Sequence, residues 1–149
     1  MVKRGFLFEF EIPDGWKETF KGTQFIFHGH AGEELIVSGA LIEGDSEEDQ
    51  NSSARLKLTD NALKAVTEAA SHPDLVIIKK LQKDKGAVAF GFECWTIHSQ
   101  TKDGSVLFSQ AVIASRCAVL LVTFEAPNFP DQLQFYRKFL HDIRTAPTQ

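Results

Sequence analysis

The sequence contains no long apolar run. No stretch of its 149 residues approaches the ~20 consecutive apolar residues that a membrane-spanning helix needs. The amino-terminal stretch MVKRGFLFEFEIP alternates apolar residues with glutamate, unlike the apolar segment of a secretory signal. We therefore expect no membrane span and a cytoplasmic protein, with a chain whose export signal has been removed as the alternative.

Positive charge is also scarce. There are 16 Lys and Arg residues against 20 Asp and Glu residues, which gives a net charge of -4 at pH 7. A protein that binds duplex nucleic acid needs a basic face that neutralises phosphates. Most of the 13 phenylalanines follow strand-like alternation, which is typical of core residues rather than of base-stacking platforms. We expect no nucleic-acid partner.

Cysteine is limited to Cys94 and Cys117. Both lie in apolar strand patterns, and the sequence carries no sign of export, so we predict two reduced, buried thiols rather than a disulfide. Both also lie away from any expected helix N-terminus that would lower a thiol pKa. We therefore expect both thiols to react slowly.

The common catalytic motifs are missing. The sequence has no phosphate-binding G-x-x-x-x-G-K or G-x-G-x-x-G loop, no G-x-S-x-G, no H-E-x-x-H and no C-x-x-C. His28 and His30 would share one face of a strand, but zinc requires three or four ligands and the sequence fixes no third one nearby. We predict no cofactor and no metal, with His28 and His30 as weak candidates. The alternative is a metal-assisted hydrolase that uses His28, His30 and Glu93.

Hydrophobic periodicity predicts both helices and strands. A period of two indicates a strand, and a spacing of three to four residues indicates an amphipathic helix. The expected strands cover residues 6–12, 24–28, 33–42, 75–81, 87–98, 106–114 and 118–125. One expected helix runs from residue 46 or 53 to 71, with the acidic run 45–49 in its first turn, and the second covers 129–144.

Turn residues show how the first strand ends. In the stretch FEFEIPDGW, Pro13 suits the second position of a type I turn and Gly15 the fourth. This turn would bring Trp16 back over the end of the strand. The ring of Trp16 is then expected to cover the edge of the core, with ligand stacking as the alternative.

A second turn fixes the register of the central hairpin. Asp103-Gly104 is a strong two-residue hairpin signal. With these two residues as the loop, Trp95 lies opposite Val112 on the neighbouring strand. The same register places residue 98 opposite residue 109.

The stretch AVLLVTF at residues 118–124 is apolar on both of its faces. Such a strand is buried on both sides, so the sheet needs cover on each face. We predict a single domain over residues 1–149 of the α/β (α+β) class. It would have a mainly antiparallel, twisted sheet with helices packed on its faces.

The order of these elements resembles the Mog/PsbP-like α/β/α sandwich, and most nearly the bacterial DcrB/PsbP-like domain. The resemblance covers nearly the whole chain. Its motifs are short: FEIPDGW at 10–16, ELIVS at 34–38, GFE at 91–93, SQAV at 109–112 and FLHDIR at 139–144. Part of the DcrB/PsbP-like group serves as adaptor chaperones for type VI secretion effectors. The resemblance therefore implies a non-enzymatic protein-binding fold.

The resemblance and the residues together suggest where a partner would bind. Two helices cover a wide sheet incompletely, which leaves an apolar strip of the kind that marks interaction sites. We expect this strip to hold Trp95, Ile97 and Val112, with Trp16 at its rim. An adaptor chaperone would shield apolar effector segments there, and a homodimer is the expected assembly for that role. An immunity or accessory subunit that binds one folded partner is the alternative.

Overall fold

The computed structural model describes residues 1–42 and 53–146. The described residues form ten strands and two helices, in an order that begins with five strands and ends with a two-residue strand. The elements are β1 (Val2–Gly5), β2 (Phe8–Glu11), β3 (Lys17–Lys21), β4 (Gln24–His28), β5 (Glu34–Leu41), α2 (Ser53–Ala70), β6 (Leu75–Lys83), β7 (Glu93–Thr101), β8 (Val106–Ala114), β9 (Ala118–Pro127), α3 (Pro130–His141) and β10 (Arg144–Thr145).

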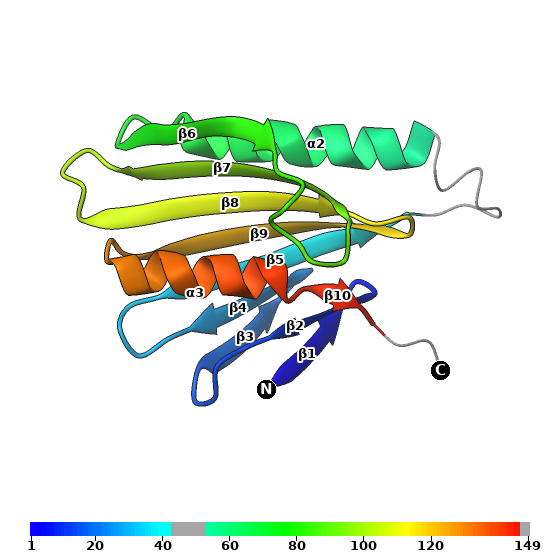
Figure 1. Cartoon of the computed structure of the whole chain (residues 1–149), viewed down its shortest axis with the longest axis horizontal. Coiled ribbons are helices and arrows are strands. Elements are labelled where there is room, and N and C mark those ends of the chain that lie inside the picture. Colours follow the sequence, from blue (N-terminus) through cyan, green and yellow to red (C-terminus); the bar gives the residue numbers. More distant parts are fainter. Residues whose placement is uncertain (43–52, 147–149) are drawn as a thin grey trace.

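The strands form two sheets of unequal size. The large sheet has seven strands in the order β3-β4-β5-β9-β8-β7-β6, and every neighbouring pair is antiparallel. The small sheet has the order β1-β2-β10. Helix α2 covers one face of the large sheet, and α3 and the small sheet cover the other (Figure 1). This layered α+β architecture confirms the expected fold class.

Strand β9 lies at the centre of the large sheet and separates two cores. Val119 packs under α2, whereas Leu120, Val122 and Phe124 pack toward α3. Tyr136 of α3 stacks on Phe124, with ring centroids 5.4 Å apart. Alternate side chains of a strand point to opposite faces, so a strand covered on both faces is apolar throughout. The predicted double burial of residues 118–124 is confirmed.

The central hairpin forms in the predicted register. Trp95 pairs with Val112, and β8 has the predicted bounds of 106–114. Gly104 takes a positive φ of 76°, which the two-residue loop requires and which glycine adopts without strain. The hairpin of β4 and β5 was also predicted correctly.

The first strand is shorter than predicted. Phe6 and Leu7 have positive φ values of 55° and 67° and turn the chain between β1 and β2. Phe6 therefore leaves the alternating series, which begins at Phe8. The turn that follows also differs, because Gly15 has a φ of 86° as its third residue, which is the type II pattern rather than type I.

Two further corrections concern the start of the predicted strand 87–98 and the end of the second predicted helix. Residues 87–92 are a loop, and β7 starts only at Glu93. Gly91 has a φ of 72°, which interrupts the extended backbone. Helix α3 ends at His141, and the chain continues into β10, which was not predicted. Helix α2 starts at Ser53, and the alternative start at 46 and the acidic run 45–49 lie outside the described residues.

Glu9 ties the small sheet together. Its carboxylate accepts hydrogen bonds from Arg4 Nε at 2.8 Å and Arg144 Nε at 3.3 Å. The hydrogen bond from Arg4 is the main reason why the pKa of Glu9 is lowered. Strand β10 is thereby held against β2, where Arg144 pairs with Glu9.

The small sheet approaches the large one where a glycine leaves room for it. The ring of Phe6 lies against Gly39 of β5, where an added Cβ would be 2.8 Å from the ring and 2.9 Å from the carbonyl oxygen of Val119. A side chain at this position would separate the two layers. Of the helices in the described residues, none is long and apolar enough to cross a membrane.

Candidate functional site

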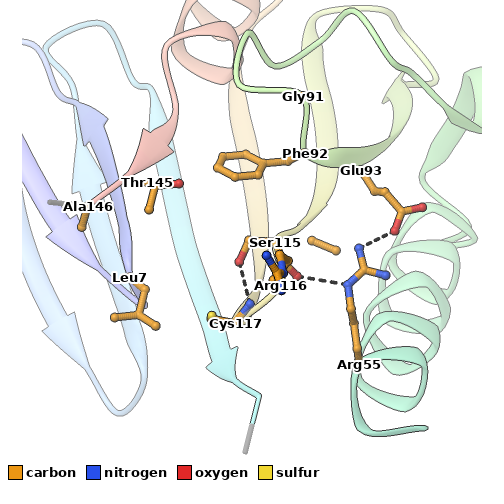
Figure 2. Close-up of a pocket in the computed structure, with 11 residues that line it drawn as sticks. Leu7, Arg55, Gly91, Phe92, Glu93, Ser115, Arg116, Cys117, Thr145 and Ala146 are labelled. Carbon is orange, nitrogen blue, oxygen red and sulfur yellow. Dashed lines mark hydrogen bonds and ion pairs between the residues drawn. The ribbon is translucent and has the colours of Figure 1, made fainter. Parts of the chain in front are cut away.

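A pocket of about 490 Å³ opens at one end of the molecule, and we call it the end pocket. Five segments that are far apart in the sequence meet there: the β1–β2 turn, the start of α2, the segment leading into β7, the β8–β9 turn and the end of β10 (Figure 2). The lining residues are Leu7, Arg55, Gly91, Phe92, Glu93, Ala114, Ser115, Arg116, Cys117, Thr145 and Ala146.

The rim of the end pocket presents apolar side chains to solvent. Leu7 is 52% exposed, and Ala146 N donates a hydrogen bond to Leu7 O at 3.0 Å, which holds the β1–β2 turn against the end of β10. Phe92 packs edge-on against Phe8 with ring centroids 5.3 Å apart. Phe90, which is 60% exposed, stacks on Phe92. Through these contacts, the apolar core around Phe8 continues by way of Phe92 to the exposed ring of Phe90 at the rim.

The opposite wall of the end pocket is charged. Arg55 of α2 forms an ion pair with Glu93 through Nη2 and donates from Nε to the carbonyl oxygen of Ser115 at 3.1 Å. Lys83 Nζ contacts the other oxygen of Glu93 at 2.8 Å. The hydrogen bonds from Lys83 and then Arg55 lower the pKa of Glu93 below its ordinary value. Glu93 is therefore a paired, ionised carboxylate rather than a general base with a raised pKa.

The β8–β9 turn that forms the floor is fixed by its own serine. Ser115 Oγ accepts hydrogen bonds from the backbone of Cys117 at 3.2 Å and Ala118 at 3.1 Å. Cys117 lies in this turn and is half-buried, which corrects the expectation that it is a buried strand residue. Cys94 is buried as expected, and neither cysteine is in a disulfide.

The expected apolar strip is not open to solvent. Ile97 and Val112 are buried under α2, and Trp95 is half-buried beside them with Lys83 Nζ 5.6 Å from its ring centroid. Trp16 belongs to the other layer, where its ring packs on Phe135 of α3 at 5.1 Å. The expected exposure of Ile97 and Val112, and the place of Trp16 at their rim, are therefore corrected. Trp16 does cover the edge of the core as expected.

The three candidate metal or hydrolase residues do not come together. His28 pairs with Glu34 at one end of β5, whereas Glu93 lies in the row of residue 40 at the other end. Six residues of strand separate the two rows by about 20 Å. His28 Nδ1 lies 3.8 Å from a Glu34 oxygen, and the ring of His30 lies over Gly15. In residues 1–42 and 53–146, no three metal-binding side chains are grouped.

Sequence reasoning singled out Glu93 but missed its partners. Arg55 lies on an ordinary amphipathic helix. Lys83 lies in the basic run 79–85, which by itself indicates only a solvent-exposed strand end and turn. Leu7 looked like part of a strand because it continues the alternation of its neighbours. One local signal for the site was present in the sequence. With a period of two, Glu93 alternates with the small residues Ala89 and Gly91 and with Trp95.

Comparison of the sequence with known families and with curated proteins gives no match. Comparison of the structure does. The solution structure of cyanobacterial PsbP (CyanoP) from Synechocystis sp. PCC 6803 aligns with a TM-score of 0.54 at 18% identity, over 94% of this chain and 87% of that one. The protein of unknown function PA94 from Pseudomonas aeruginosa aligns with a TM-score of 0.54 at 19% identity, over 99% and 98% of the two chains.

A third similar structure comes from Bacteroides thetaiotaomicron VPI-5482. It aligns with a TM-score of 0.51 at 11% identity over 95% of this chain, which spans 46% of that longer protein. At these identities the likeness concerns the fold and not the activity. The chain has the PsbP-like α+β sandwich fold that the resemblance implies.

Proposed function

We propose that this chain is a non-enzymatic module that binds a protein partner at the end pocket. The observation that carries the proposal is an open, largely apolar pocket whose rim exposes Leu7 and Phe90. Exposed apolar side chains gathered around a concavity mark interaction sites. The candidate catalytic carboxylate, Glu93, is already engaged by two cations, which supports binding rather than acid–base chemistry.

The geometry favours a partner that inserts an apolar side chain. A pocket of about 490 Å³ is large enough for a leucine or an aromatic side chain, and burial of such a group in a pocket dominates the binding energy of many interfaces. The Arg55–Glu93–Lys83 cluster lies beside the opening. Polar groups of the partner's backbone would meet this cluster at the rim, as in interfaces with an apolar centre and a polar edge.

This proposal has two more specific forms. As an adaptor chaperone for type VI secretion effectors, the chain would shield apolar segments of the effector. As an immunity or accessory subunit, it would bind one folded protein. Binding of isolated apolar peptides favours the first, and binding that requires the folded partner favours the second. A cytoplasmic location and a homodimer belong to the adaptor form, and sedimentation of the purified protein tests the dimer.

The test is capture of a partner by variants of the end pocket. Leu7→Asp places a charge on the rim, and its backbone cost is small because aspartate tolerates a positive φ better than most residues do. Phe90→Ser removes the exposed ring. Each variant is expected to weaken partner binding by about tenfold or more, the loss that interface anchors usually show.

The matched control is Phe129→Ser. Phe129 is 64% exposed and precedes α3 at the other end of the sheet, where serine is a favourable helix N-cap. It therefore removes a similar exposed ring without weakening the fold. Two outcomes would contradict the end pocket as the binding surface. One is an equal loss of the captured protein in the Phe129 and Phe90 variants, and the other is its full retention in the Leu7 and Phe90 variants.

A further inference from the structure

A second cavity of about 310 Å³ lies on the other side of the large sheet from α2, between β6–β7 and α3, and we call it the α3 cavity. Its walls come from β6 and β7, from the loop that follows β6, and from the second half of α3. The residues that matter here are Lys79, Asp84, Thr96, His98, Tyr136 and Arg137. The α3 cavity shares no lining residue with the end pocket.

Two hydroxyl groups on the walls of the α3 cavity are buried and have no hydrogen-bond partner among the described residues. Tyr136 is 0% exposed and Thr96 is 2% exposed, and both hydroxyl oxygens are unpaired. Buried polar groups in folded proteins are nearly always hydrogen-bonded, because an unpaired one is unfavourable. Two unpaired hydroxyls on one cavity therefore point to a ligand that accepts from both.

The charges around the α3 cavity are mainly positive. Lys79 and Arg137 lie on its walls, and Asp84 is the carboxylate among its lining residues. Burial, followed by the charges of Lys79 and Arg137, lowers the pKa of His98. The sum of two fixed cations and one carboxylate favours an anionic guest.

His98 is positioned to add a further contact. Its Nδ1 lies 2.9 Å from Ser109 Oγ, and its ring meets the ring of Tyr136 edge-on, with centroids 6.2 Å apart. When Ser109 donates to Nδ1, the tautomer of the neutral ring carries its proton on Nε2, which makes that nitrogen a donor. The site then offers hydroxyl and ring N–H donors together with two cationic groups.

We propose that the α3 cavity binds a small oxyanion, a carboxylate or phosphate group of a small molecule. The hydroxyls of Tyr136 and Thr96 donate to its oxygens, and Lys79 and Arg137 balance its charge. The cavity is at the small end of the range for ligand sites, which suits a compact anion and not a polypeptide. The two sites share no residue, so this proposal does not depend on partner binding at the end pocket.

The test uses the full chain and two simple probes, inorganic phosphate and acetate. Each is titrated against the ¹⁵N-labelled protein, with sodium chloride at matched ionic strength as the reference. We expect saturable shifts of the backbone amides of Thr96, His98 and Tyr136. The probe that binds more tightly identifies which oxyanion the site prefers.

Variants separate a built site from general charge attraction. Arg137→Gln is expected to weaken binding by about tenfold, because it removes one charged donor. Lys138→Gln is the matched control, since Lys138 is the next residue of α3 and does not line the cavity. An equal loss of anion affinity in Arg137→Gln and Lys138→Gln would contradict binding in the α3 cavity.

Tyr136→Phe gives a readout that does not depend on charge. It keeps the ring that stacks on Phe124 and removes only the unpaired hydroxyl. We expect the variant to be at least as stable as the wild type in chloride, and phosphate or acetate to raise the melting temperature of the wild type more than that of the variant. If neither phosphate nor acetate gives a saturable shift, the proposal is wrong. The hydroxyls of Tyr136 and Thr96 would then bind only water.

Discussion

The guanidinium of Arg55 at the start of α2 is paired with the carboxylate of Glu93 at the first residue of β7. The pair connects the helix layer to the strand that borders the end pocket. A double-mutant cycle of Arg55→Gln and Glu93→Gln is expected to give a coupling energy of about 1 kcal/mol, the upper range for partly exposed pairs. Urea denaturation of the four proteins measures it. A coupling of zero would mean that the pair does not hold the two layers together.

The same pair predicts how stability depends on pH. Because Lys83 and Arg55 lower the pKa of Glu93 in the folded protein, its contribution is fully present above the unfolded pKa, near 4.5. The contribution is lost as the pH falls through the lower folded pKa. The difference in unfolding free energy between wild type and Glu93→Gln should therefore shrink on acidification below that value. A difference that grew on acidification would show a raised pKa instead.

The two cysteines should differ in reactivity. Burial raises the pKa of Cys94 to about 12, so its thiolate is scarce at neutral pH. Cys117 is half-buried and lines the end pocket. We therefore expect Cys117 to react faster than Cys94, in place of the two slow thiols that the sequence predicts. In the native protein, a thiol reagent should modify Cys117 faster than Cys94, and the variants Cys94→Ser and Cys117→Ser assign the two rates.

Gly39→Ala should separate the small sheet from the large one. The added methyl group would meet the Phe6 ring and the Val119 carbonyl oxygen at 2.8 and 2.9 Å, and the backbone oxygen cannot move away as a flexible side chain can. We expect a loss of about 1–3 kcal/mol in the unfolding free energy. Gly86→Ala is the control, because nothing lies within 4 Å of a Cβ there. Equal stability of the two variants would contradict the close approach of Phe6.

Helix α3 should be essential to the fold. Leu140 of α3 points into the core and is buried. Leu→Ala at such a site lowers the free energy of unfolding by about 2–5 kcal/mol. Leu56→Ala on the exposed side of α2 should cost much less. Chemical denaturation compares both with wild type. A midpoint for Leu140→Ala that equals the wild-type midpoint would show that α3 contributes little to the core.

The central strand β8, which is largely buried, could be predicted from the sequence, whereas the exposed strand β3 and the two-residue strand β10 could not. Strand β8 has apolar residues and an Asp-Gly turn at its start, so its bounds and register followed directly. All five residues of β3 are exposed, so no pattern of burial marks it as a strand. Strand β10 has two residues and exists only because β2 lies beside it.

The candidate site was harder to predict for a similar reason. Its walls come from five segments, and Arg55 and Glu93 are 38 residues apart in the chain. Their pairing depends on where α2 crosses the sheet, which local spacing does not determine. Along the predicted strand 87–98, Glu93 alternates with small and aromatic residues, but residues 87–92 form a loop, so that strand face does not exist.

The pairing of Arg144 with Glu9 has a consequence for biosynthesis. A ribosome makes residue 9 long before residue 144, so the free edge of β2 stays unpaired until almost all of the described chain has been synthesised. Until then, nascent chains could pair with one another along that edge. The edge closes when residues 144–145 have left the ribosome, and slowing translation over the codons of β10 should therefore raise the fraction of newly made protein that aggregates.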